Sequence, residues 1–116
     1  MSGRRVLVLE DEPLIAILVQ DWLDELGYEP VGPARSVPEA LSIISSQMLH
    51  AAILDVSLGN ADSFPVADDL KARNIPFAFA TGRDERSVPP RHADAPILPK
   101  PYDLEAIKIV MNELSA

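Results

Sequence analysis

Arg5-Val6-Leu7-Val8-Leu9-Glu10-Asp11 is the stretch that best indicates the fold of this chain. Its apolar part is short and continuous, without the polar alternation of a strand that has one face in water. Such a run is typical of a strand buried on both faces of a parallel sheet. We therefore expect a buried strand with two carboxylates at its carboxyl end.

Similar apolar runs recur along the chain and predict the other strands of this sheet. They are Ala51-Ala52-Ile53-Leu54, Phe77-Ala78-Phe79-Ala80 and the shorter Ile97-Leu98. Residues 28–34 contain two prolines and a glycine, which suits an edge strand because a missing N–H is tolerated there. The sequence thus predicts five strands.

Helical patterns lie between these runs. Residues 14–26 place one apolar stripe toward a core, formed by Ile15, Leu18, Val19, Trp22 and Leu26. Ser36 and Glu39 form a capping box before a second helix, and residues 66–73 predict a shorter third one. Asp103 can cap a last helix with a core side made of Leu104, Ile107, Met111 and Leu114.

The alternation of strands and helices predicts an α/β fold with right-handed crossovers. We expect a doubly wound, five-stranded parallel sheet with helices on both faces. Residues 82–91 are polar and interrupted by proline, so the fourth helix should be short or replaced by a loop. With 116 residues, we expect a single domain over residues 1–116.

Composition limits the function. The formal net charge of -8 disfavours nucleic-acid binding, and without cysteine there is neither a disulfide nor a thiolate zinc site. The apolar runs are too short for a signal peptide or a membrane span. We expect a soluble, cytoplasmic protein with no membrane partner.

Polar residues follow four of the predicted strands. They are Glu10, Asp11, Asp55, Thr81 and Lys100. In doubly wound sheets ligands bind at the carboxyl ends of the strands. Clustered carboxylates repel one another unless a cation neutralises them, and oxygen ligands suit Mg²⁺. Beside such a cation, a carboxylate can attack an in-line phosphoryl group. Each residue alone has an ordinary explanation as a turn, cap or loop residue, but the set in this order favours a reactive site.

These motifs carry a family resemblance. Leu9-Glu10-Asp11-Glu12, Leu54-Asp55, Ala80-Thr81-Gly82 and Leu98-Pro99-Lys100-Pro101-Tyr102 resemble, in that order, the receiver domain of two-component response regulators. The resemblance covers nearly the whole chain and implies the flavodoxin-like fold of chemotaxis-type receivers. Phe79-Ala80-Thr81-Gly82 with the lysine motif is further similar to the stand-alone "FAT GUY" receivers of alphaproteobacteria, which are paired with histidine kinases of the HWE and related groups.

The resemblance implies roles for individual residues. Asp55 is the implied phosphoacceptor, which receives its phosphoryl group from a sensor histidine kinase. Glu10, Asp11 and Asp55 would hold Mg²⁺ together with the backbone carbonyl of Ser57. The implied roles at the other strand ends are a Lys100 contact to a phosphoryl oxygen, a cis bond to Pro101 and a Thr81 that reorients toward the phosphoryl group.

Three departures from the family pattern bear on the mechanism. Glu10 stands where an Asp is commoner, which lengthens one ligand arm. Residues 58–62 replace the usual Met-Pro-Gly stretch after the acceptor. Ile97 occupies the position of an aromatic switch residue, so we predict a modified switch carried by the loop at residues 82–91.

The leading hypothesis is a single-domain regulator with no output domain and no enzymatic turnover, which signals by protein contact or as a phosphate carrier or sink. An aspartyl-phosphate hydrolase is a second reading, but Ser57 stands where such hydrolases place an acid. A flavin carrier lacks support because Glu10-Asp11-Glu12 would repel phosphate. A degenerate receiver that binds partners without phosphorylation stays open.

A few residues outside this site also have predicted roles. We expect solvated His50 and His92 and a core role for Trp22. Exposed Ile17 and Ile109 would suit a partner or homodimer surface, with the last helix the better candidate.

Overall fold

The computed structural model describes residues 4–59, 61–82 and 88–115. One parallel sheet has the strand order β2-β1-β3-β6-β7. Its strands are β1 (Arg4–Leu9), β2 (Tyr28–Ala34), β3 (Ala51–Asp55), β6 (Phe77–Thr81) and β7 (Ile97–Pro99). The proline-containing strand β2 lies at an edge, as predicted. The predicted five-stranded sheet is confirmed.

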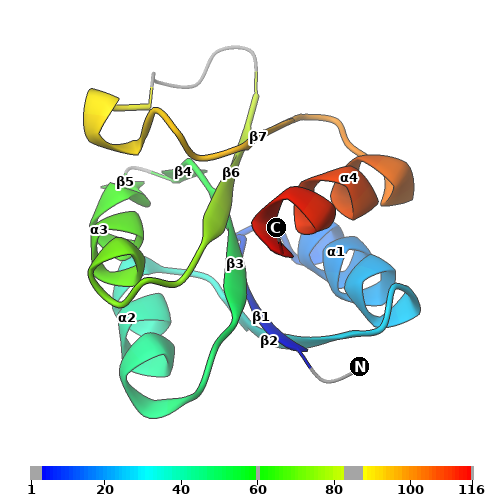
Figure 1. The fold of residues 1–116 in the computed structure, drawn as a ribbon, viewed down its shortest axis with the longest axis horizontal. Helices are drawn as coiled ribbons and strands as arrows, with labels where there is room; N and C mark the ends of the chain where they lie inside the picture. Colours follow the sequence, from blue (N-terminus) through cyan, green and yellow to red (C-terminus); the bar gives the residue numbers. More distant parts are fainter. Residues whose placement is uncertain (1–3, 60, 83–87, 116) are drawn as a thin grey trace.

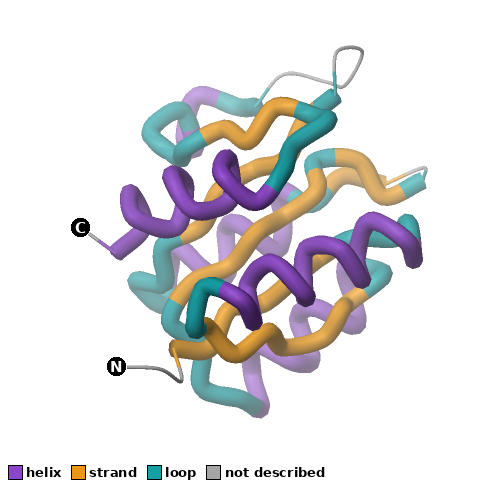
Figure 2. The backbone as a smooth tube through the Cα atoms, turned by 90° about the vertical axis from the view of Figure 1, so that its right-hand side faces the viewer, coloured by secondary structure: helices purple, strands orange, loops and turns teal. Residues whose placement is uncertain are grey.

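Helices cover both faces of the sheet. α1 (Pro13–Glu25) and α4 (Leu104–Ser115) lie on one face, and α2 (Val37–Ser46) and α3 (Phe64–Ala72) on the other (Figure 1). Figure 2 shows the sheet from the side of α1 and α4. Each face has its own buried apolar cluster, because strands covered on both sides need apolar residues at successive positions. The doubly wound architecture is therefore confirmed.

Side-chain caps determine where two helices begin. The Ser36 hydroxyl accepts the Glu39 N–H at 3.3 Å, while the Glu39 carboxylate accepts the N–H of Arg35 at 2.9 Å. Asp103 Oδ1 accepts the N–H of Ala106 at 3.0 Å at the start of α4. These bonds satisfy N–H groups that lack a partner in the first helical turn.

The buried face of α1 differs from the predicted stripe. Its buried residues are Ala16, Val19 and Leu23, whereas Leu18 is 46% exposed. The prediction for Leu18 was wrong because a count of large apolar residues overlooked Ala16, whose small side chain is only 2% exposed. Trp22 is partly buried against the core, as expected.

Two connections complete the described fold. After β3, an antiparallel hairpin of β4 (Ser57–Leu58) and β5 (Ala61–Asp62) precedes α3, and the sequence did not predict it. Between β6 and β7, the described residues form only the short 3-10 helix η1 (Pro90–His92). Residues 83–87 of the predicted loop lie outside the described residues. The described part agrees with a fourth helix that is short or replaced.

Gly32, in the edge strand, is expected to be intolerant of a side chain. Its φ is +105°, and an added Cβ would lie 2.7 Å from Ala34 N and 3.2 Å from Val8 O. We expect Gly32→Ala to lower the free energy of unfolding by about 2–4 kcal/mol in urea denaturation. Gly27→Ala is the control, because its φ is +93° but nothing lies within 4 Å; its loss should be about 1 kcal/mol. Equal losses would contradict the steric argument.

Candidate acidic site at the carboxyl edge of the sheet

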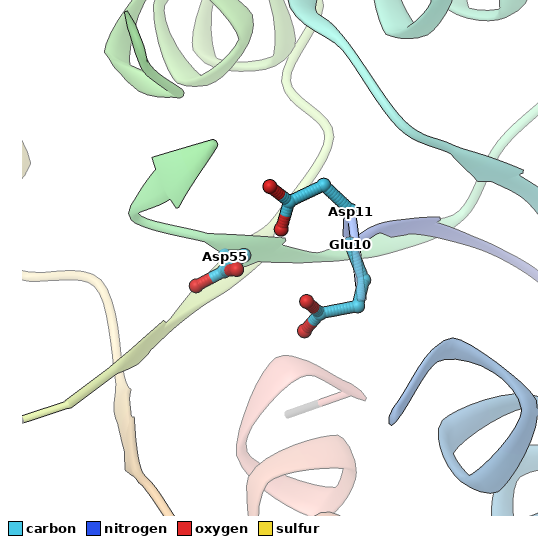
Figure 3. A group of neighbouring side chains, drawn as sticks. All are labelled: Glu10, Asp11 and Asp55. Carbon is cyan, nitrogen blue, oxygen red and sulfur yellow. The ribbon is translucent and has the colours of Figure 1, made fainter. Parts of the chain in front are cut away.

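Three carboxylates meet where β1 and β3 end. Glu10 and Asp11 follow β1 and Asp55 ends β3, and the pairing of these neighbouring strands brings their ends together. One ligand oxygen from each lies within 4.8 Å of the others, and the groups lie around one space at this edge (Figure 3). Glu10 and Asp55 are only 3% and 2% exposed, whereas Asp11 lies nearer the surface. The structure thus groups all three predicted carboxylates.

Lys100 reaches the same site from the end of β7. Its Nζ donates to Asp55 Oδ1 at 2.8 Å, and its backbone N–H donates to the Thr81 carbonyl at 2.8 Å. The Lys100–Pro101 peptide bond is cis, as predicted. Since β6 and β7 are paired, the predicted lysine and threonine sit on adjacent strand ends. Lys100 therefore compensates part of the negative charge around Asp55.

Thr81 and Ser57 frame this group. Thr81 is the last residue of β6 and is half-buried. Ser57 lies two residues after Asp55, as the first residue of β4, where it pairs with Asp62. The hairpin thus follows directly from the proposed acceptor and holds the backbone at Ser57 in a regular conformation.

Burial and charge alter the ionisation of Glu10. Burial, and next the nearby negative charge of Asp55, raise its pKa from 4.5 to about 7, although the Glu12 N–H, which donates to Glu10 Oε2 at 3.1 Å, acts in the opposite direction. A donor set made only of oxygens fits a hard divalent cation such as Mg²⁺. Such a cation would relieve the repulsion that raises this pKa.

The contribution of Glu10 to the stability of the metal-free protein should therefore fall as pH rises from about 4.5 to about 7. In this range folded Glu10 keeps a proton that the unfolded chain has released, so raising the pH favours unfolding. Urea denaturation at several pH values checks this. Glu10→Gln should flatten the profile, and so should saturating Mg²⁺ for the native chain. Asp24→Gln, on the exposed side of α1, is the control and should leave the slope unchanged.

Tyr102 borders the site although sequence reasoning gave it no role. Burial, with the negative charges of Glu10 and Asp55, raises the pKa of its phenol. Its ring packs edge-on against Trp22, with centroids 6.3 Å apart. Beside Lys100 opens an apolar cavity of about 390 Å³, lined also by Ile15, Leu18, Trp22, Pro101 and Tyr102. The signal that could have indicated this contact was an aromatic residue two positions after the lysine.

The two histidines have structural partners outside the site. His50 is exposed, as predicted, and its Nδ1 accepts the backbone N–H of Arg5 at 2.9 Å. His92 is 3% exposed, so its predicted solvation was wrong. It packs against Phe77 and Phe79, because the chain beyond Pro90 folds back onto β6. A polar sequence neighbourhood gave no sign of these aromatic neighbours.

The two isoleucines of the predicted partner surface lie on α1 and α4. Ile17 and Ile109 are 53% and 55% exposed, in agreement with the predicted exposure. In the described part of the chain, every helix is too short or too polar to cross a membrane.

The fold and site together define a protein class. Residues 6–112 match the response regulator receiver domain, so the chain belongs to this family. The resemblance found in the sequence is thereby confirmed.

Individual proteins of this family are similar to the chain in sequence and in structure. SdrG from Sphingomonas melonis Fr1 has a solution structure with 42% sequence identity and a TM-score of 0.89, with full coverage of both chains. The BeF3-activated conformation of SdrG gives a TM-score of 0.82. The phyllosphere-induced regulator PhyR of Methylorubrum extorquens is 32% identical over 93% of this chain and 42% of its own length. The transcriptional regulatory protein PdtaR of Mycobacterium tuberculosis is 32% identical over 87% of this chain and 51% of its own. The chain thus spans about half the length of these two relatives.

Proposed function

We propose that this receiver accepts one phosphoryl group on Asp55 from the phosphohistidine of a sensor histidine kinase, in a Mg²⁺-dependent reaction. The observation that carries the proposal is the Lys100 Nζ to Asp55 Oδ1 contact of 2.8 Å beside two further carboxylates. A buried carboxylate paired with a lysine at a strand end is both oriented and charge-compensated. Such a carboxylate is suited to act as the nucleophile.

In the proposed reaction, a carboxylate oxygen of Asp55 attacks the phosphorus in line with the phosphorus–nitrogen bond of the donor. An acyl phosphate forms, the phosphorus–nitrogen bond breaks, and the histidine nitrogen leaves with the electron pair. Lys100 and the Thr81 hydroxyl stabilise the charge on the equatorial oxygens. Mg²⁺, when held by Glu10, Asp11, Asp55 and the Ser57 carbonyl, supplies further neutralisation of that charge.

Each chain would be modified once and is not expected to turn over substrate as an enzyme. An aspartyl-phosphate hydrolase would need an acid to protonate its leaving group. The residue two positions after Asp55 is Ser57, which cannot take this role at neutral pH. A serine in place of an acid at this position favours the interpretation as a phosphoacceptor that keeps its phosphoryl group for signalling.

The phosphorylated chain would signal through contact with a partner protein, or it would act as a carrier or sink of phosphoryl groups. We further propose a cytoplasmic location, a kinase of the HWE type as donor, and no contact with nucleic acid, given the net charge of -8. The exposed apolar residues Leu14, Ile17 and Leu18 of α1 offer a contact surface for the donor, while Ile109 on α4 offers one for a second copy.

The proposal is tested by incubating the chain with acetyl phosphate and measuring its intact mass. We expect a gain of one phosphoryl group with Mg²⁺ and none after chelation. If no gain occurs with acetyl phosphate or with the cognate kinase, the proposal fails. The chain would then be a degenerate receiver that binds partners without phosphorylation.

A further inference from the structure

His92 is a buried polar residue that the proposed reaction does not use. It belongs to η1, the turn on the α3 side of the sheet that is yellow in Figure 1. Its Nε2 lies 2.7 Å from Asp68 Oδ1 on α3. Its ring centroid lies 5.4 Å from that of Phe77 and 5.9 Å from that of Phe79, both on β6. His92 therefore connects α3 with the central part of the sheet.

The hydrogen bond to Asp68 has a defined direction. Hydrogen bonding from Arg91 is the main cause that holds the pKa of Asp68 below its ordinary value, and His92 contributes in the same direction. The carboxylate is therefore ionised at neutral pH and can only accept, so His92 Nε2 must carry the hydrogen. Among the described residues, Nδ1 of the same ring has no partner. The imidazole is thus held to α3 by one charge-assisted bond.

Neighbouring residues hold the same turn on α3. Arg91 donates to both carboxylate oxygens of Asp68, at 2.8 and 3.2 Å. Lys71 Nζ donates to the Arg91 carbonyl at 2.6 Å. These contacts and the His92 bond form one polar cluster, which we call the α3 latch (Asp68, Lys71, Arg91 and His92). It joins the turn that contains η1 to the helix α3.

The latch holds the turn that contains η1 beside the sheet. Between β6 and β7, η1 is the only helical segment that the structure describes, and it has three residues. An open cavity of about 590 Å³ lies beside it, lined among others by Asn74, Glu113 and Leu114. The outer side of the turn therefore lacks close packing, and the polar contacts to α3 hold it in place.

The latch lies directly behind the strand that carries Thr81. Side chains alternate along a strand, so Phe77, Phe79 and Thr81 share one face of β6. Phe79 also packs edge-on against Phe64, the first residue of α3, with centroids 5.6 Å apart. A movement of Thr81 toward the site would shift this face, which is the surface that His92 covers. Ring contacts thus run from the latch through Phe79 to Phe64, on the face of the strand that ends in Thr81.

We propose that the hydrogen bond between His92 and Asp68 holds this receiver in its unphosphorylated conformation and is released when the site is activated. The inference rests on the proposed function. In β7, this chain has Ile97, which is 45% exposed, at the position of the aromatic switch residue. The ring of His92 would respond to Thr81 in its place.

The test uses Asp68→Ala as the main variant, because this side chain is 47% exposed and its loss should not prevent folding. His92→Phe is the second variant, since it keeps a ring in the aromatic cluster and removes only the bond to α3. The matched control is Asp69→Ala. It removes a neighbouring carboxylate with its own ion pair to Arg73, away from the latch.

Two measurements are made on the full chain. Amide hydrogen exchange of residues 88–95, without any phosphoryl mimic, should accelerate in both latch variants and stay unchanged in Asp69→Ala. Beryllofluoride with Mg²⁺, titrated by NMR, should bind about five- to tenfold more tightly to the latch variants, because they no longer hold the resting conformation. The control should bind like the native chain.

The outcomes separate this inference from the proposed function. If the native chain binds beryllofluoride but both latch variants bind it equally or more weakly, the latch is a structural contact only and the inference is overturned. If the native chain binds none, the proposed function fails instead. Faster exchange together with tighter binding would support the latch as a switch.

Discussion

Asp55→Asn is expected to abolish phosphorylation completely. The side chain is 2% exposed at the end of β3, and its Oδ1 accepts from Lys100 Nζ at 2.8 Å. An amide of nearly the same shape fills the same space but is not a nucleophilic carboxylate. The intact mass after treatment with acetyl phosphate and Mg²⁺ should therefore show no added phosphoryl group, whereas the native chain gains one.

A control and a structural check make this result specific. Asp24→Asn removes a carboxylate from the exposed side of α1 and should be phosphorylated like the native chain. Circular dichroism should show that Asp55→Asn keeps its fold. A full mass gain in Asp55→Asn would assign the acceptor to another residue.

Lys100→Ala is expected to slow phosphorylation about 100-fold, the size of effect seen when one charge-stabilising donor is removed from a reactive site. Its ammonium group pairs with Asp55 before the reaction and would pair with a phosphoryl oxygen in the transition state. In the variant, Glu10, Asp11 and Asp55 keep their mutual repulsion without this compensation. The initial rate of mass gain at fixed acetyl phosphate and Mg²⁺ measures the effect.

Lys108→Ala on the exposed side of α4 is the matched control, since it removes the same charge away from the site. Its rate should equal that of the native chain. A normal rate in Lys100→Ala would show that the lysine only balances charge in the resting protein. A loss of rate at low Mg²⁺ that disappears at high Mg²⁺ would place its role in metal binding instead.

These two variants also distinguish the remaining readings of the chain. A degenerate receiver would show no phosphorylation in the native protein, so neither substitution could change the result. A hydrolase would show turnover of an aryl phosphate at a rate that depends on Asp55. The proposed phosphoacceptor shows one stable addition that both substitutions reduce.

Much of the candidate site could be predicted because it depends on where strands end. Apolar runs mark the strands, because a strand buried on both faces needs apolar residues at successive positions. Parallel strands place their carboxyl ends at one edge of the sheet. That argument alone placed Glu10, Asp11, Asp55 and Lys100 in one group, as the structure shows. The roles assigned to these residues stay predictions until the experiments above are done.

Other features could not be predicted because they depend on contacts between distant segments. His92 is surrounded by polar residues and proline in the sequence, yet the fold places it between Asp68 and two phenylalanines. Leu18 fits an apolar stripe, yet α1 buries Ala16 and leaves Leu18 46% exposed. A periodic pattern identifies an amphipathic element but does not give its rotation against its neighbours.

The sequence by itself determined the order of the five strands of the parallel sheet and of the four α-helices, and the residues gathered at the carboxyl edge, because these follow from periodicity and short connections. Only the tertiary structure decided the ionisation of Glu10, the cavity beside Lys100, the contact of Tyr102 with Trp22 and the burial of His92. These properties arise from desolvation and packing between residues that are far apart in the chain. A sequence pattern does not show which distant residues will be in contact.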